Sequence, residues 1–244
     1  NDEIAELGRT FNEMLDRLDY AFTSQRAFMA DVSHELRTPI TIIRGHLETL
    51  GDDPEERREA MAVVADELDR MSRLVDDLLV LARSSRPDFL RVEPLDLDLL
   101  THDLLGKARQ LGPRDWHLDN VGLGLVHADR QRITQAVMNL ADNAVHHTNE
   151  SDRISLGTSS DEREARIWVR DSGPGISLAD QRRIFERFAA GNNGGAGLGL
   201  SIVRAVAEAH GGRVEVDSAP GLGATFVLVI PTETASGLRR SGGH

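Results

Sequence analysis

Two long stretches with a heptad pattern of apolar residues constrain the first third of the chain. In residues 1–18 the apolar side chains are spaced alternately by three and four: Ile4, Leu7, Phe11, Met14 and Leu18. A second stretch, residues 55–83, contains no glycine or proline and repeats the pattern at Met61, Val64, Leu68, Met71, Val75, Leu78 and Ala82. This spacing predicts long helices that bury one face against another helix.

A turn separates the two helices of this region. The sequence GDDPEE, residues 51–56, offers a glycine to end one helix and a proline to begin the next. Residues 1–86 are therefore predicted to form a helical hairpin with an N-terminal extension. Two helices bury only part of such stripes, so we expect a homodimer that closes a four-helix bundle. The alternative is a monomeric hairpin packed on the rest of the chain.

A polar patch lies on the first helix of this hairpin, in the sequence FMADVSHELRTPIT. The buried stripe of that helix is predicted from its apolar residues: Val32, Leu36, Ile40, Ile43, Leu47 and Leu50. At about 100° per residue, His34 lies about 160° from both Val32 and Leu36. His34 is therefore predicted to face solvent, with Arg37 and Thr38 beside it.

The pattern changes after the linker-like sequence SSRPDFL. Short strand-like runs follow: RVEPL, GLGLVHA, RISLGTS, EARIWVRDS, GRVEVDSA and ATFVLVIP. Helical patterns lie between them, at about residues 97–110, 130–147, 178–188 and 200–210. This alternation predicts a second, α/β domain, followed by a tail without periodicity that is expected to be disordered.

Composition excludes several classes of function. The formal net charge of -12 argues against a nucleic-acid partner, because a polyanion is bound by clustered Lys and Arg. The absence of cysteine excludes disulfides, a thiolate nucleophile and a zinc–thiolate site. No apolar run approaches the roughly 20 residues that a membrane span needs, so the chain as given is expected to be soluble.

Three stretches of the second domain carry candidate ligand-binding residues. In NLADNAVHHT, Asn139 and Asn143 share a helix face and His146 follows one turn later; amide oxygens suit Mg²⁺. Taken alone, such a pair is more often plain helix surface. In VRDSGPGI, Asp171 ends a predicted strand before Gly173 and Gly175. This carboxylate could accept a hydrogen bond from an amino group such as that of adenine, although an ordinary Asp–Gly turn is equally consistent.

The third stretch is the glycine-rich sequence GNNGGAGLGLSIV, which precedes an apolar helix. Its glycines include Gly195, Gly197 and Gly199. Backbone N–H groups at such a helix start can bind phosphate. The stretch lacks the lysine of a P-loop and does not follow a strand, so neither a P-loop nor a dinucleotide-binding fingerprint is assigned. A flexible linker is the alternative.

The chain resembles the cytoplasmic part of a sensor histidine kinase of a bacterial two-component system. The resemblance covers nearly the whole sequence and rests on motifs in the family's order. FMADVSHELRTPIT looks like the phosphoacceptor box, NLADNAVHHT the asparagine box and DSGPGI the first glycine box. IFERF looks like the phenylalanine box, GGAGLGLSIVRAVAEAHGG the second glycine box and PGLGATF a terminal one.

The resemblance implies a fold and an origin. It implies a dimeric four-helix-bundle hairpin, followed by a two-layer α/β sandwich of the histidine kinase and gyrase (Bergerat) ATP-binding type. The expected parts are a HAMP-like signal helix (1–22), the dimerisation and phosphotransfer hairpin (23–86), a linker (87–91), the ATP-binding domain (92–231) and the tail (232–244). By the same resemblance, these residues are the cytoplasmic portion of an inner-membrane sensor, attached to the membrane only through segments that precede them.

The resemblance also assigns chemical roles in the hairpin. His34 would attack the γ-phosphate of ATP, and Glu35 would orient the imidazole and accept its proton. The phosphate would then pass to an aspartate of a response regulator receiver domain. Thr38 would position a water molecule for dephosphorylation of that regulator.

In the ATP-binding domain, the resemblance assigns Asn143 to Mg²⁺ and Asn139 to the phosphate region. Asp171 would bind the adenine amino group, with Gly173 and Gly175 beside it. The glycines at 195, 197 and 199 would form the phosphate-side hinge of a lid. His146 stands where the family commonly has a lysine, and the lid is short. A non-catalytic or phosphatase-dominant dimeric scaffold with weak nucleotide binding is therefore the alternative; a free ATPase is disfavoured by the attached hairpin.

Overall fold

The computed structural model describes residues 2–51, 53–181, 183–188 and 197–232. The chain divides into two compact units, of which the first ends at Val75 and the second begins at Asp76. The predicted disordered tail, except for Thr232, lies outside the described residues. The side chains of Ile4, Leu7 and Leu18 also lie outside the described part.

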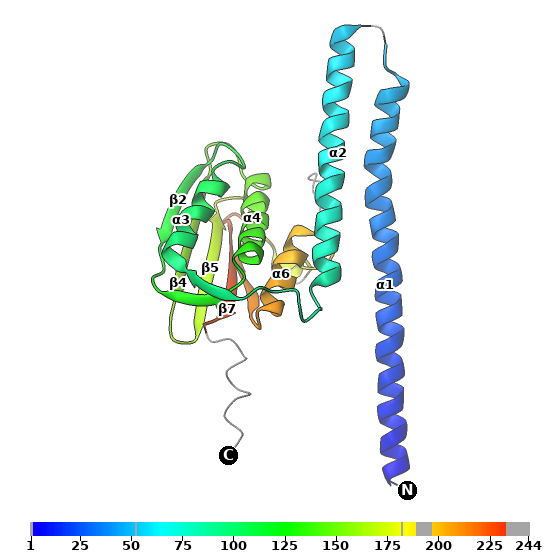
Figure 1. The fold of residues 1–244 in the computed structure, drawn as a ribbon, viewed down its shortest axis with the longest axis vertical. Helices are drawn as coiled ribbons and strands as arrows, with labels where there is room; N and C mark the ends of the chain where they lie inside the picture. The colour runs from blue at the N-terminus through cyan, green and yellow to red at the C-terminus, as the bar shows by residue number, and fades with distance from the viewer. Residues whose placement is uncertain (1, 52, 182, 189–196, 233–244) are drawn as a thin grey trace. The chain divides into compact units, whose positions relative to one another are not determined.

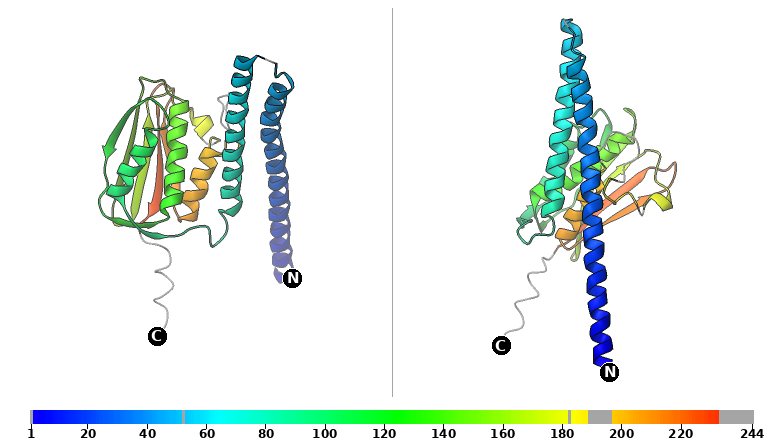
Figure 2. Two further views of the ribbon diagram at one scale, coloured as in Figure 1. Left: turned by 45° about the horizontal axis from the view of Figure 1, so that its top comes forward. Right: turned by 90° about the vertical axis from the view of Figure 1, so that its right-hand side faces the viewer.

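Helix α1 and most of helix α2 build the first unit. Helix α1 spans Asp2–Glu48 without interruption, and helix α2 begins at Pro54 and ends at Arg83. They run side by side in opposite directions (Figure 1; Figure 2), so the predicted hairpin is confirmed. The predicted N-terminal extension is continuous with the helix that carries His34.

The apolar residues of the hairpin divide between two faces. Val64 and Leu74 of α2 are buried, whereas Leu68 and Val75 remain 54% and 45% exposed. On α1 the neighbours Pro39 and Ile40 differ in the same way, because Pro39 is buried and Ile40 is 51% exposed. The predicted stripes therefore combine residues from a face buried within this chain with residues from a face that the single chain leaves exposed.

The second unit is an α/β domain. Its strands are β1 Glu93–Asp96, β2 Asp115–Asn120, β3 Leu125–Ala128, β4 Arg153–Ser160, β5 Glu164–Asp171, β6 Arg213–Ser218 and β7 Ala224–Pro231. Its helices are α3 Leu97–Ala108, α4 Arg130–His146, α5 Leu178–Gln181 and α6 Gly199–Ala209. Five strands form one sheet in the order β2-β4-β5-β7-β6, and β1 pairs with β3 separately. Only the β2–β4 pair of that sheet is parallel.

Helices α3, α4 and α6 cover one face of this sheet (Figure 1). The predicted two-layer sandwich is confirmed. Its core is formed by apolar side chains of both layers that are almost completely buried, among them Leu97, Leu100, Leu104, Ile133, Leu140, Ile154, Leu156, Ile167, Ile202, Phe226 and Leu228. Burial of each such side chain contributes roughly 1.5–3 kcal/mol, which holds α4 and α6 in fixed positions on the sheet.

Two elements differ from the prediction. Strand β2, DWHLDN, was not predicted, because most of its residues are polar and exposed and its pairing with β4 is at the sheet edge. The helix predicted over residues 178–188 was too long, since α5 ends at Gln181. Beyond α5 the chain turns, Phe185 packs edge-on against Phe226 with ring centroids 6.2 Å apart, and Phe188 has a φ of 58°.

Candidate functional site

The polar patch of α1 has the predicted exposure. His34 and Thr38 are exposed and Glu35 is half-buried. The Thr38 hydroxyl donates to the carbonyl oxygen of His34, one turn earlier, at 3.4 Å. The imidazole is thus reachable from solvent.

The two asparagines of the asparagine box lie on α4 and are half-buried. Asn139 faces the start of α6: its side-chain nitrogen lies 3.5 Å from the carbonyl oxygen of Gly199. A Cβ on Gly199 would lie 3.7 Å from the Cβ of Asn139, which is an ordinary van der Waals distance, so the two residues are direct neighbours. The structure therefore brings the asparagine box and the second glycine box together.

Asp171 is the last residue of β5 and lies near His147, at the C-terminal end of α4. Its Oδ1 accepts the N–H of Gly173 at 2.9 Å, and burial raises its pKa, an effect opposed by this hydrogen bond and by nearby His147. A Cβ on Gly173 would lie 2.5 Å from the carbonyl oxygen of His147. Only glycine lets this loop approach α4 so closely, and the result is a buried carboxylate at a backbone-lined edge.

Gly175 makes the next turn of this loop possible. Its φ is +71°, and a Cβ there would lie 2.0 Å from the carbonyl oxygen of Ala219. Gly223, with a φ of +76°, approaches the carbonyl oxygen of Asp171 in the same way. The first and terminal glycine boxes are thus packed against one another, which fixes the loop that follows Asp171.

The glycine-rich segment is described from Gly197 onward. The backbone N–H of Phe188 donates to the carbonyl oxygen of Gly197 at 3.0 Å, so the residue that ends the preceding described stretch is bonded to the start of this one. Gly197 has a φ of +66°, and Gly199 is the first residue of α6. The prediction for Gly195 lies outside the described residues.

His146 interacts with its own helix. Its Nδ1 lies 2.8 Å from the carbonyl oxygen of Asp142 and 3.4 Å from the Asp142 carboxylate, and the side chain is exposed. Among the described residues, neither this hydrogen bond nor this ion pair connects it to Asp171 or Gly199. Its predicted part in nucleotide binding remains a prediction.

Arg114 holds the C-terminal end of α4, a role that its sequence context does not predict. Its guanidinium donates to the carbonyl oxygens of Val145 at 3.0 Å and Thr148 at 2.9 Å, and to the Thr148 hydroxyl at 3.0 Å. A cation at a helix C-terminus satisfies free carbonyls and complements the helix dipole. No local signal marks Arg114, because its partners lie more than 30 residues further along the chain.

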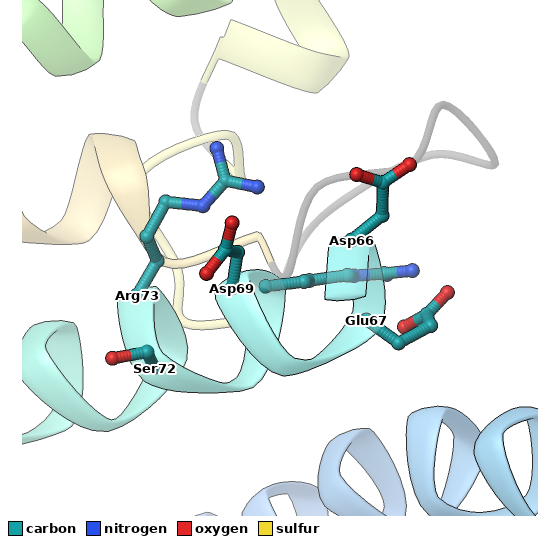
Figure 3. A pocket seen from close by; sticks show the side chains of 6 residues that line it. Asp66, Glu67, Asp69, Ser72 and Arg73 are labelled. Carbon is teal, nitrogen blue, oxygen red and sulfur yellow. The ribbon is translucent and has the colours of Figure 1, made fainter. Parts of the chain in front are cut away.

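A surface hollow lies elsewhere, on α2 (Figure 3). It is lined by Asp66, Glu67, Asp69, Arg70, Ser72 and Arg73. None of the motif residues lines it, and its lining is charged, so we do not assign it to nucleotide binding.

Cation binding in the second unit would rest on amide oxygens. In the parts of the chain that the structure describes, no three His, Asp or Glu side chains are grouped to hold a metal ion. The side chain of Asn143 offers an amide oxygen, a type of ligand that suits Mg²⁺ when waters and phosphate oxygens complete its shell. Among the same residues, no helix has the length and apolar composition to cross a membrane.

Two family models match the chain. Residues 24–87 match the His Kinase A phosphoacceptor domain, and residues 128–234 match the histidine kinase-, DNA gyrase B- and HSP90-like ATPase domain. Together they define a phosphoacceptor hairpin joined to an ATPase-type domain. The chain belongs to the sensor histidine kinases of two-component systems.

Individual relatives agree with this assignment. The chain is 41% identical to the sensor histidine kinase TcrY of Mycobacterium tuberculosis, over 95% of this chain and 52% of TcrY. It therefore spans about half the length of that relative. The fold is similar to histidine kinase ThkA in complex with response regulator TrrA, with a TM-score of 0.67 and 30% identity over 85% of this chain and 61% of that one. Full-length ShkA in complex with AMPPNP gives a TM-score of 0.62 and 34% identity over 84% and 46% of the two chains.

Proposed function

We propose that this chain is an ATP-dependent protein-histidine kinase that phosphorylates itself on His34 and passes the phosphoryl group to an aspartate of a response regulator. One observation carries the proposal: an exposed His34 lies on a phosphoacceptor hairpin, while a separate compact unit brings Asn139, Asp171 and Gly199 around α4. The AMPPNP bound to ShkA and the regulator bound to ThkA support nucleotide binding and a receiver-domain partner.

The residues divide the work of phosphoryl transfer. Buried Asp171 would accept a hydrogen bond from the adenine amino group, because a carboxylate held in a fixed position selects a base that has a donor at that edge. Asn143 would hold Mg²⁺, which when bound bridges phosphate oxygens and neutralises their charge. The N–H groups at the start of α6, near Gly199, would bind phosphate. His34 would attack in line while Glu35 accepts the imidazole proton.

Two further roles belong to the same proposal. Thr38 lies one turn from His34 and would position water for dephosphorylation of the regulator. The exposed apolar face of the hairpin would be covered by a second copy of the chain, so the working unit would be a homodimer. We also propose that these residues are the cytoplasmic part of an inner-membrane sensor.

Radiolabelled ATP tests the kinase proposal directly. The chain is incubated with Mg²⁺ and γ-labelled ATP beside its His34→Gln variant, and each product is treated with acid and with base. We expect an acid-labile, base-stable label that is absent from the variant. Nucleotide binding without any label would contradict the kinase reaction and favour a scaffold or phosphatase, and hydrolysis independent of His34 would indicate a free ATPase.

A further inference from the structure

The segment between α2 and β1 is folded rather than extended. The N–H of Arg86 donates to the carbonyl oxygen of Arg83 at 2.9 Å, and the N–H of Phe89 donates to that of Arg86 at 3.1 Å. Two consecutive turns thus connect the last residue of α2 to Phe89. A free tether would leave these backbone groups to solvent.

Phe89 and Arg91 attach this segment to the start of α4. Phe89 is only 6% exposed, and the guanidinium carbon of Arg132 lies 4.5 Å from the centre of its ring. The N–H of Arg91 donates to Oδ2 of Asp129 at 2.8 Å. An apolar contact, a cation–π contact and a charge-assisted hydrogen bond therefore converge on one helix end.

Asp129 connects the same point to α6. It is the N-cap of α4, where Oδ1 accepts the N–H of Arg132 at 3.0 Å. Its own N–H donates to Nε2 of His210 at 3.0 Å, just beyond the end of α6. Nδ1 of His210 therefore carries the proton and donates to the carbonyl oxygen of Val206 at 2.8 Å. One residue thus joins the linker to both helices that carry the nucleotide motifs.

The division of the chain agrees with this attachment. The boundary between the two compact units falls inside α2, between Val75 and Asp76, so the linker belongs with the nucleotide domain.

We propose that the linker is a docked segment, held on α4 by Phe89 and Arg91, and that this docking sets the rate of phosphoryl transfer to His34 without setting the affinity for ATP. The inference on rate rests on the proposed kinase function. A docked linker restricts the orientations in which the nucleotide can approach His34, which shortens the search for the reactive geometry.

Three variants of the full chain test the docking. Phe89→Ala removes the buried ring, and Arg132→Gln removes the guanidinium above it while keeping the ring in place. Arg130→Gln is the matched control, because Arg130 lies on the same helix turn and pairs with Asp103 instead of the linker. Hydrogen exchange is followed in peptides that cover residues 84–92. We expect exchange there to rise at least about tenfold in the first two variants and to stay unchanged in the control.

The same variants are then compared in two functional measurements. We expect the rate of His34 labelling to fall about fivefold or more in Phe89→Ala and Arg132→Gln, with the dissociation constant of AMPPNP unchanged. Unchanged exchange would overturn the docking, and faster exchange with an unchanged labelling rate would overturn its role in transfer. If the variants also bind AMPPNP more weakly, the claim that docking affects only the rate of transfer is wrong. No label on the unmodified chain would contradict the kinase function and the rate effect, while the exchange data would still decide the docking.

Discussion

At the scale of single residues, the site depends on backbone approaches that few side chains permit. Gly173, Gly175 and Gly223 let two loops and the end of α4 meet around Asp171. The buried carboxylate needs this enclosure, because a fixed acceptor shielded from water discriminates between ligands better than a solvated one. Arg114 adds to it by satisfying carbonyls at the end of α4.

Substitution of Gly175 by alanine should strongly destabilise the second unit. The new Cβ would lie 2.0 Å from a backbone oxygen, and the φ of +71° disfavours any side chain. We expect a loss of about 2–5 kcal/mol, measured by denaturant unfolding. The control is Gly221→Ala, which has a φ of +82° but no atom within 4 Å of its Cβ. It should lose only about 1–2 kcal/mol, and equal losses would show that the close contact is not decisive.

His210 should make the stability of the second unit depend on pH. Burial lowers its pKa from the ordinary value of 6.5, against the opposing influence of the Val206 carbonyl and Asp129. Below about pH 6.5 the unfolded chain therefore binds more protons than the folded one, and the free energy of unfolding decreases as the pH falls. The raised pKa of Asp171 acts with the opposite sign: above its ordinary value of 3.8 the folded chain binds more protons at this carboxyl than the unfolded chain, so its contribution to the free energy of unfolding decreases as the pH rises through the folded pKa.

The measurement compares thermal unfolding of the chain and its His210→Gln variant between about pH 7.5 and pH 5.5. We expect the unmodified chain to lose stability more steeply than the variant over this range. Parallel curves would show that His210 does not contribute to the pH dependence.

At the scale of elements, helix α2 places charged side chains on two of its sides. Figure 3 shows Asp66, Asp69 and Arg73 projecting from the side away from α1, whereas Glu67 projects towards α1. Oε2 of Glu67 is buried and has no hydrogen-bond partner among the described groups. A carboxylate at such a position opposes the apolar packing of the hairpin.

Replacing Glu67 by leucine should stabilise the hairpin. The change removes a buried oxygen that has no hydrogen-bond partner and adds apolar surface. We expect the free energy of unfolding, measured by circular dichroism, to increase by about 1–3 kcal/mol. The exposed neighbour provides the comparison: Asp66→Leu should change stability by less than about 0.5 kcal/mol. A loss of stability in Glu67→Leu would mean that the carboxylate is paired in the working protein.

At the scale of the whole molecule, each helix of the hairpin keeps exposed apolar side chains. They are Ile40 and Leu47 of α1 and Met61, Leu68 and Val75 of α2, each about half exposed in the single chain. The seven-residue spacing keeps the side chains of each helix on one stripe of that helix. These stripes are the surfaces that a second copy would cover in the proposed dimer.

Leu68→Glu should therefore convert a dimer into a monomer, because it places a charge in the middle of the α2 stripe. Leu178 of the second unit is 81% exposed, so Leu178→Glu is a matched control that should leave the mass unchanged. Light scattering at about 10 μM measures the mass of both variants and of the unmodified chain. A monomeric unmodified chain, or a dimeric Leu68→Glu variant, would contradict the proposed assembly.

The sequence alone determined the elements that depend on local periodicity. The heptad spacing predicts α1 and α2, the exposure of His34 follows from its angle to Val32 and Leu36, and the order of the motifs identifies the family. Asn139 and Asn143 share a face because any helix places residues four apart together. These features can be predicted from residues that lie close together in the sequence, without the tertiary structure.

Contacts between groups that are far apart in the sequence depend on how the folded elements pack. Arg114 reaches carbonyls at the end of α4, Gly223 approaches Asp171, and Asp129 bonds to His210 from 81 positions away. Strand β2 exists because β4 offers it a partner, although its own sequence is mostly polar. Sequence periodicity does not predict such contacts, because they are set by the packing of the sheet against its helices. This packing depends on residues from the whole chain.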